Sequence, residues 1–250
     1  MKNLEKKVAI VTGGGSGIGR SISLLYALEG AKIIVSDIDE KGGNETVSEI
    51  KAKGGEALFV KADTAKPGDS EKVAEQAVKQ FGGLHIAVNN AGIGGPFKPV
   101  GEYPVDGWDK VISINLSGVF YGLRYQIPAM LSSGGGSIVN IASILGKVAA
   151  KNSPAYVAAK HGVVGLTKAA ALEYADKKIR INSIGPGYIN TPLVTKNFDD
   201  AAMKALVELH PIGRLGTSEE VAELALWLNS DKASFVTGAY YNIDGGYLTQ

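Results

Sequence analysis

The sequence predicts an α/β fold in which helices cover both faces of a doubly wound parallel β-sheet. Three observations lead to this prediction. Short apolar runs rich in β-branched residues alternate with longer segments of helical periodicity along all 250 residues. Runs such as Val8-Ala9-Ile10-Val11 are apolar on both faces, as strands buried inside a parallel sheet must be. The composition, 45% hydrophobic and 20% charged, is ordinary for a packed globular protein.

Seven strands and six helices are expected along the chain. The strands are predicted at the β-branched runs Val8–Thr12, Lys32–Asp37, Ala57–Lys61, Leu84–Asn89, Ser137–Ala142, Arg180–Ile184 and Tyr240–Ile243. Helices are predicted between them, near residues 17–30, 40–53, 67–81, 105–132, 153–176 and 217–229. The last helix should begin with a capping box, because Thr217 is followed three residues later by Glu220.

The whole chain, residues 1–250, is interpreted as one domain, because no linker, repeat or low-complexity tract divides it. Residues 187–216 follow the sixth strand and contain Pro192 and Pro211. Because long insertions at the carboxyl end of such a sheet commonly cover a ligand, we expect this segment to be a substrate lid.

The overall charge and the residue types exclude several classes of function. The net charge is +1, from 26 basic and 25 acidic residues, so neither nucleic acid nor a membrane surface is expected as a partner. Cysteine is absent, and the three histidines are scattered, so no metal site is predicted. The N-terminal apolar run is too short for a signal peptide, and a cytoplasmic location is the default expectation.

A glycine-rich turn, from Gly13 through Gly17 to Gly19, joins the first strand to the first helix. Glycines in this place let backbone N–H groups approach a pyrophosphate at the helix N-terminus. Asp37 ends the second strand, where a carboxylate can bind the ribose hydroxyls of NAD and repel the extra phosphate of NADP. Neither Ser16 nor Ile38 is basic, so NADH is expected to be preferred over NADPH.

Tyr156 and Lys160 are four residues apart, which places them on one face of a helix. Ser153 and Pro154 suit the N-cap and the first helical position, so this helix should begin just before Tyr156. A cation ~4 Å from the phenol would favour the phenolate by up to ~4 kcal/mol at an effective dielectric constant of ~20. The pair therefore predicts a tyrosine whose pKa is lowered toward neutral pH for acid–base catalysis.

Six motifs in the same order resemble those of the short-chain dehydrogenase/reductase family, and the resemblance extends over essentially the whole chain. They are Gly13/Gly17/Gly19, Asn89-Asn90-Ala91-Gly92, Asn115, Ser143, Tyr156/Lys160 and Pro186-Gly187. The resemblance implies a Rossmann-type sheet in the order 3-2-1-4-5-6-7, hydride transfer with a nicotinamide cofactor and, in many members, a homotetramer. The free carboxylate of Gln250 would then lie near its symmetry mates, although a solvated terminus is expected.

The resemblance also implies a role for each residue of the catalytic group. Tyr156 would be the acid in ketone reduction and the base in alcohol oxidation, and Lys160 would lower its pKa and bind the nicotinamide ribose. Ser143 would hydrogen-bond the substrate oxygen. Asn115 would hold a water that relays protons. Taken alone, Ser143 would be interpreted as a strand-end serine, and Asn115 as an amide that caps the backbone at a helix kink.

Further cofactor contacts are implied at positions that match the family motifs. They are Ser16, Ile18, Asp63, Thr64, Asn90, Ala91, Gly92, Pro186, Gly187, Ile189 and Thr191. Two of these have ordinary alternatives, since Asp63 could be a turn aspartate and Thr191, which precedes Pro192, could cap a helix.

The substrate pocket is expected to be apolar. Its predicted walls are Leu145, Tyr188, Leu193, Met203 and Leu206, although several of these could instead pack within the lid itself. Because no basic cluster is present to bind a phosphate or carboxylate, the predicted substrate is a small, neutral, fairly apolar ketone or secondary alcohol. The alternatives are a 3-oxoacyl-thioester reductase acting on acyl carriers, a polyol or sugar dehydrogenase, and a non-enzymatic NAD-binding regulator or scaffold.

Overall fold

The computed structural model describes residues 2–195 and 199–249, and the expected surroundings of Gln250 lie outside these ranges. Seven strands form one sheet in the order β3-β2-β1-β4-β5-β6-β7, and every neighbouring pair is parallel. The strands are β1 Val8–Thr12, β2 Lys32–Asp37, β3 Ala57–Lys61, β4 Ile86–Asn89, β5 Gly136–Ile141, β6 Ile179–Pro186 and β7 Tyr240–Ile243. The predicted fold and strand order are confirmed, with ends that differ by at most two residues.

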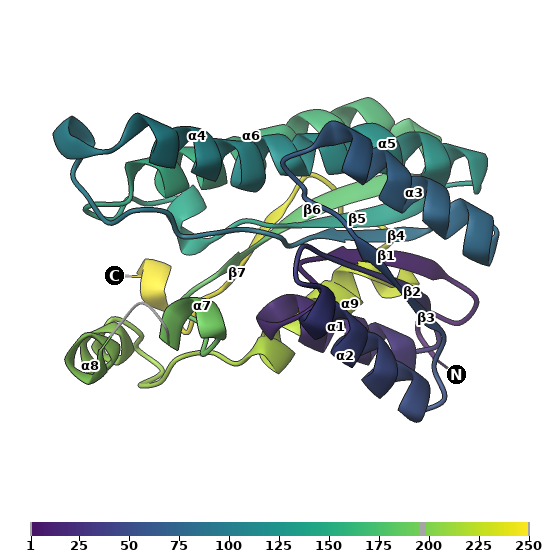
Figure 1. The fold of residues 1–250 in the computed structure, drawn as a ribbon, viewed down its shortest axis with the longest axis horizontal. Coiled ribbons are helices and arrows are strands. Elements are labelled where there is room, and N and C mark those ends of the chain that lie inside the picture. Colours follow the sequence, from purple (N-terminus) through teal and green to yellow (C-terminus); the bar gives the residue numbers. More distant parts are fainter. Residues whose placement is uncertain (1, 196–198, 250) are drawn as a thin grey trace.

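The helices form a layer on each face of this sheet (Figure 1). One layer contains α1 Gly17–Leu28, α2 Glu40–Ala52 and α9 Ser218–Asn229. The other contains α3 Pro67–Phe81, α4 Val105–Ile112, α5 Gly118–Ser132 and α6 Pro154–Tyr174. The predicted capping box of α9 is present, because Thr217 and Glu220 each accept a hydrogen bond from the other's backbone N–H. Ser153 is the N-cap residue of α6, but its side chain makes no capping hydrogen bond.

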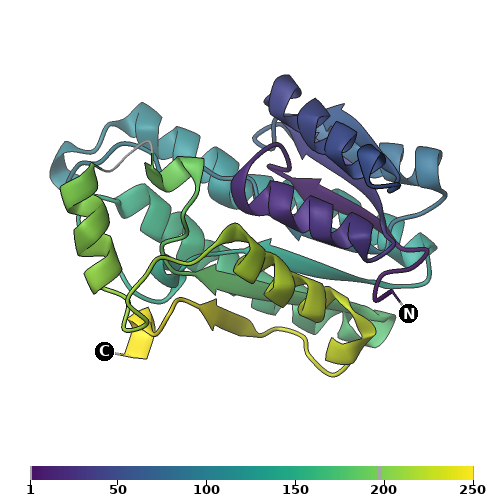
Figure 2. The same cartoon turned by 90° about the horizontal axis from the view of Figure 1, so that it is seen from below.

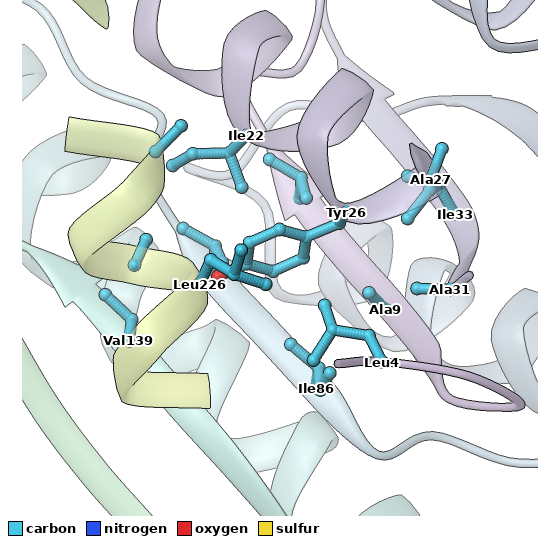
Figure 3. Close-up of a cluster of buried hydrophobic side chains, with 14 of the residues drawn as sticks. Leu4, Ala9, Ile22, Tyr26, Ala27, Ala31, Ile33, Ile86, Val139 and Leu226 are labelled. Carbon is cyan, nitrogen blue, oxygen red and sulfur yellow. The ribbon is translucent and has the colours of Figure 1, made fainter. Parts of the chain in front are cut away.

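Two apolar cores hold the layers to the sheet, one on each face. In the core beneath α1, Figure 3 shows the fully buried Tyr26 ring extending toward Leu226 of α9. The Tyr26 hydroxyl accepts a 2.7 Å hydrogen bond from the Asn229 amide, so the one polar atom of this ring is satisfied inside the core. These cores fix the strands and thereby the positions of the loops at their carboxyl ends.

The segment 105–132 is the clearest departure from the predicted elements. It was expected as one helix, but a π-helical turn, η2 Ser113–Ser117, separates α4 from α5. A π-turn contains one residue more than an α-turn, and such insertions often occur at functional sites. Asn115 lies inside this turn and is fully buried.

The expected lid segment, 187–216, leaves the end of β6 and returns to the same place. An isolated parallel bridge joins Ile189 to Gly216. Two hydrogen bonds flank it, from Asn190 N to Gly216 O at 2.9 Å and from Gly216 N to Tyr188 O at 3.0 Å. We call these residues the neck. Beyond the neck lie two short helices, α7 Pro192–Thr195 and α8 Asp200–Glu208, near the C-terminal turn (Figure 2).

Within the described ranges, no helix is both long and apolar enough to cross a membrane.

Candidate active site

The glycine turn between β1 and α1 is held in place by the loop that follows β4. The Asn90 side-chain amide donates hydrogen bonds to Thr12 O at 2.9 Å and to Gly13 O at 3.3 Å. Gly13 has φ +64°, and a Cβ added to it would lie 2.8 Å from Asn90 Nδ2. A Cβ on Gly19 would overlap Gly13 O. The turn therefore requires glycine at these positions and leaves the backbone open toward the adjacent groove.

A groove of about 270 Å³ lies beside this turn. Eleven of the predicted cofactor-binding residues line it: Gly13, Ser16, Gly17, Ile18, Asp37, Asp63, Thr64, Asn90, Ala91, Gly92 and Thr191. Six lining residues were not predicted: Ser36, Ile38, Ala62, Ile93, Ile114 and Pro192. Their carboxyl-end positions on neighbouring strands and turns are the signal that would have indicated most of them.

Several predicted residues have other positions. Leu193 was predicted as a wall of the substrate pocket, yet it also lines this groove. Gly19, Pro186, Gly187 and Ile189 are not among the residues that line it. Ile189 is buried and belongs to the neck, while Gly187 lies against His210, where a Cβ would come within 2.8 Å of the imidazole Nε2.

Two carboxylates face the groove. Asp37 Oδ2 accepts a 2.8 Å hydrogen bond from Gly15 N, and its Oδ1 accepts one of 2.9 Å from Asp39 N, so its orientation is fixed. Asp63 accepts a 3.0 Å hydrogen bond from Ala65 N, which is the turn role considered as its alternative, and still lines the groove. Among the lining residues there is no lysine or arginine.

Tyr156 and Lys160 lie on α6, one turn apart, as the sequence predicts. Lys160 is only 3% exposed, and its Nζ donates a 2.8 Å hydrogen bond to Ile141 O at the end of β5. The same Nζ lies 5.5 Å from the centre of the Tyr156 ring. Burial lowers the pKa of Lys160 to about 8.

The expected lowering of the Tyr156 pKa is wrong for the protein without ligands. Although the side chain is only half-buried by area, desolvation of its hydroxyl raises the pKa of Tyr156 to about 12. A hydrogen bond with the Ser143 side chain opposes this rise in pKa, and the nearby Tyr188 phenol adds to it. Desolvation outweighs the cation here because Lys160 interacts with a backbone carbonyl rather than with the phenol oxygen.

Ser143 follows β5 and begins the 3₁₀ turn η3 Ile144–Gly146. Its Oγ accepts a 3.1 Å hydrogen bond from Leu145 N, so it does cap the turn, as the ordinary interpretation of a strand-end serine requires. Its hydroxyl also interacts with Tyr156, which brings Ser143, Tyr156 and Lys160 into one cluster.

The Asn115 amide fastens the π-turn η2 to the edge of the groove. Its Nδ2 donates to Ile93 O at 2.8 Å, and its Oδ1 accepts from Ile93 N at 2.9 Å. A Cβ on Gly92 would lie 3.2 Å from Asn115 Oδ1 and 3.8 Å from Lys160 Nζ, so Asn115 borders the cluster. The side chain thus has the backbone-capping role that was considered as its alternative.

The predicted pocket residues differ in how deeply they are buried. Leu145 and Leu206 are buried, Met203 is half-buried, and Leu193 is 44% exposed. Thr191 donates a 3.2 Å hydrogen bond to Ile189 O and accepts one from Thr195 N, so it also starts α7.

His210 is a buried residue that the sequence reasoning missed. Its Nε2 accepts a 3.1 Å hydrogen bond from Tyr188 N, and its Nδ1 lies 2.7 Å from Leu206 O. Because a backbone N–H can only donate, Nε2 is the acceptor and Nδ1 carries the proton. The ring also packs edge-on against Tyr188. No local pattern in the sequence distinguishes this histidine from a surface one.

Comparisons with known proteins agree with one another. A family model described as Enoyl-(Acyl carrier protein) reductase matches residues 13–248. Cyclohexanol dehydrogenase of Acinetobacter sp. (strain SE19) is 54% identical over 246 residues, which cover 98% of this chain and 96% of that protein. The chain belongs to the short-chain dehydrogenase/reductase family.

Other members of the short-chain dehydrogenase/reductase family are similar over nearly the full length. Cis-4-hydroxycyclohexanecarboxylate dehydrogenase of Sinomonas cyclohexanicum is 41% identical over 242 residues, which cover 97% of this chain and 96% of that protein. The crystal structure of levodione reductase has a TM-score of 0.92 at 36% identity and covers 97% of this chain and 98% of its own. The chain of 250 residues is therefore an oxidoreductase. It uses a nicotinamide cofactor to interconvert a ketone and a secondary alcohol.

Proposed function

We propose that the chain is an NAD(H)-dependent dehydrogenase of cyclic secondary alcohols, and a reductase of the corresponding ketones. The observation that carries this proposal is the cluster of Tyr156, Ser143 and Lys160 beside a groove edged by the Asp37 carboxylate. The relatives suggest that the substrate is a cyclic alcohol, because two of them are named for substrates that contain a cyclohexane ring.

The residues of the groove fit a dinucleotide. The glycine turn at the N-terminus of α1 suits a pyrophosphate, because the first backbone N–H groups of a helix have no acceptor within the helix. The Asp37 carboxylate lines the groove and is fixed by the hydrogen bond from Gly15 N, which supports a role in binding the ribose hydroxyls. With two carboxylates and no basic side chain among the lining residues, a 2′-phosphate would be repelled, which supports NADH over NADPH.

The protonation states favour Tyr156 as the proton donor in ketone reduction. Its pKa of about 12 keeps the phenol neutral at pH 7, so a proton is available at its hydroxyl. Lys160, with a pKa of about 8, is still mostly charged at pH 7 and stabilises the negative charge that develops when the proton leaves. When bound, the nicotinamide supplies or accepts the hydride. Ser143 holds the substrate oxygen beside Tyr156, and Asn115 keeps the groove edge in place.

The proposed substrate is neutral and fairly apolar. Leu145 and Leu206 are buried, and the predicted pocket residues include no charged side chain. A thioester on an acyl carrier, the substrate class named in the family description, would instead be favoured by a basic docking surface, and the balanced net charge of +1 gives no sign of one.

The proposal is tested by initial rates at 340 nm with cyclohexanol and NAD⁺, cyclohexanone and NADH, an acetoacetyl thioester and a sugar. We expect fast turnover of the cyclic pair with NAD(H). In the same assay, Tyr156→Phe should lose at least about 10³-fold in kcat, because the proton donor is gone, while NADH binding measured by fluorescence persists.

Tyr174→Phe, at the far end of α6, is the matched control and should keep wild-type rates. Retained turnover in Tyr156→Phe would contradict the mechanism. A strong preference for the thioester and NADPH would contradict the substrate and cofactor together.

We also propose that the chain assembles as a homotetramer, in the cytoplasm where NAD(H) is available. Large apolar side chains are exposed on two helices and on the loop before β7. Leu172 on α6 is 85% exposed and Phe120 on α5 is 48% exposed, and Phe235 is fully exposed just before β7. Exposed apolar side chains of this size support symmetric contacts between copies of the chain, as a tetramer with D2 symmetry needs.

A further inference from the structure

Tyr240, the first residue of β7, reaches the loop that carries Ser143. Its hydroxyl donates a 2.8 Å hydrogen bond to the backbone carbonyl of Ser143, which is 97 residues away in the chain. The same carbonyl also accepts a 2.8 Å hydrogen bond from Gly146 N. Two donors from different elements therefore fix the peptide plane that follows Ser143.

The Tyr240 ring is positioned by the neighbouring strand. β7 pairs with β6 so that Tyr240 lies opposite Ser183, with Gly185 two residues further along β6. A Cβ on Gly185 would overlap the Tyr240 phenol, so the ring crosses β6 at the one place where the side chain is missing. On its other side the ring contacts Lys147, whose Nζ lies 5.0 Å from the ring centre. The hydroxyl thus has little freedom to leave the Ser143 carbonyl.

We infer that Tyr240 is a positioning residue, whose hydroxyl holds the Ser143 peptide so that the Ser143 side chain stays directed at Tyr156 and the substrate oxygen. The inference rests on the proposed function, because it gives Ser143 its role in catalysis. Tyr240 itself does not line the groove. It acts through Ser143, whose Oγ is attached to the same short stretch of backbone.

This role has a consequence that a purely structural role lacks. The hydrogen bond from Ser143 lowers the pKa of Tyr156 against the stronger effect of desolvation. If Ser143 loses its alignment, that lowering weakens and the pKa of Tyr156 rises. Alcohol oxidation needs the deprotonated phenol, so its rate should then require a higher pH.

The decisive variant is Tyr240→Phe, which keeps the ring over Gly185 and removes only the hydroxyl. We expect kcat to fall about five-fold, which corresponds to the ~1 kcal/mol of an ordinary hydrogen bond. The pH profile of kcat for alcohol oxidation should shift to higher pH, while the Kd for NADH stays within about two-fold of wild type. Tyr241→Phe is the matched control, because its ring lies against Trp227 instead, and it should change none of these quantities.

Two kinetic results would overturn the inference. One is a Tyr240→Phe enzyme with wild-type kcat and pH profile. The other is a variant in which kcat, NADH affinity and melting temperature fall together with an unshifted profile, as general destabilisation would cause.

Crystal structures of wild type and Tyr240→Phe provide a readout that does not depend on activity. We expect the Ser143 peptide to rotate and its Oγ to move in the variant. An unmoved Ser143 would overturn the inference even if no alcohol is turned over. A displaced Ser143 in an enzyme that is inactive on every cyclic alcohol would overturn the proposed function alone.

Discussion

Lys160 is a buried cation whose protonation depends on folding. In the unfolded chain its pKa is the ordinary 10.5, and burial lowers it to about 8 in the folded protein. Between these pH values the unfolded chain holds a proton that the folded protein has lost, so the free energy of unfolding rises with pH. Below pH 8 the folded protein must hold the buried charge, and this contribution to stability is absent. The shift corresponds to roughly 3 kcal/mol.

Replacement of Lys160 by methionine should remove this pH dependence. We expect the stability of wild type relative to Lys160→Met to increase by about 2 to 3 kcal/mol between pH 7 and pH 10, as measured by urea denaturation. Lys168→Met, an exposed position on the same helix, serves as control and should parallel wild type. If the free energy of unfolding of Lys160→Met instead follows that of wild type at every pH, burial does not change the protonation of this lysine.

The Asp37 carboxylate should decide between the two nicotinamide dinucleotides. In the double variant Asp37→Ser/Ile38→Arg, the repelling charge is lost and a guanidinium faces the same groove. We expect the ratio of kcat/KM for NADPH over NADH to rise at least about 100-fold. Asp39→Ser is the control: Asp39 is the N-cap of α2, a role that serine also fills, so this change removes a nearby carboxylate and should leave the ratio unchanged. An unchanged ratio in the double variant would contradict the assignment.

At the residue scale, the sequence predicted which side chains meet but not their electrostatics. The i, i+4 spacing of Tyr156 and Lys160 is local, so it survives folding. The Tyr156 pKa was predicted in the wrong direction because it depends on desolvation, which distant elements create. His210 and Tyr240 were missed as parts of the site for the same reason, since their partners are 22 and 97 residues away.

At the scale of elements, His210 joins α8, within the segment 187–216, to the end of β6. Its Nε2 accepts a hydrogen bond from Tyr188 N in the neck, and its Nδ1 donates one to Leu206 O on α8. In His210→Phe the ring still fills the space beside Tyr188, but both hydrogen bonds are lost. Leaving these buried groups unpaired costs about 2 kcal/mol of local stability. We expect KM for the alcohol to rise, NADH affinity to persist, and limited proteolysis within 187–216 to accelerate.

His210→Gln retains one donor and one acceptor, so it should restore part of the wild-type KM. Wild-type KM and wild-type proteolysis in His210→Phe would show that this histidine does not fix the segment 187–216 in place.

The elements themselves were predicted well where their pattern is local. The strands and most helices agree within two residues, because hydrophobic periodicity and caps determine them. The interruption of 105–132 could not be predicted in this way. Asn115, inside the π-turn, forms two hydrogen bonds with the backbone of Ile93. Ile93 belongs to the loop after β4, so this contact is not encoded by the local pattern of 105–132. The short helices α7 and α8 were not predicted either, because a helix of fewer than ten residues is too short for a periodic apolar pattern to stand out.

At the scale of the whole molecule, alternation of strands and helices predicts a parallel sheet, but the strand order came from the resemblance to a family. The order reverses between β1 and β4, so the carboxyl ends of these strands meet at the groove. This reversal is the reason that the glycine turn and Asn90 lie together. No local pattern encodes it.

The proposed tetramer makes a prediction at this scale. Leu172→Glu and Phe235→Asp each replace an exposed apolar side chain by a charge, one on α6 and one on the loop before β7. Each variant should yield dimers, and the two changes together should yield monomers, by size-exclusion chromatography with light scattering. Val78→Glu on α3, another exposed apolar position, is the control and should leave the assembly unchanged. A wild-type protein that is already monomeric would refute the assembly.

The neck has a consequence for how such an enzyme can diversify. Because Ile189 and Gly216 are paired, the excursion between them enters and leaves the sheet at a single point. The sequence of this segment can therefore change without altering the spacing of the strands or the cluster of Ser143, Tyr156 and Lys160. A new substrate preference then requires changes only between Ile189 and Gly216, apart from Thr191, Pro192 and Leu193, which line the groove.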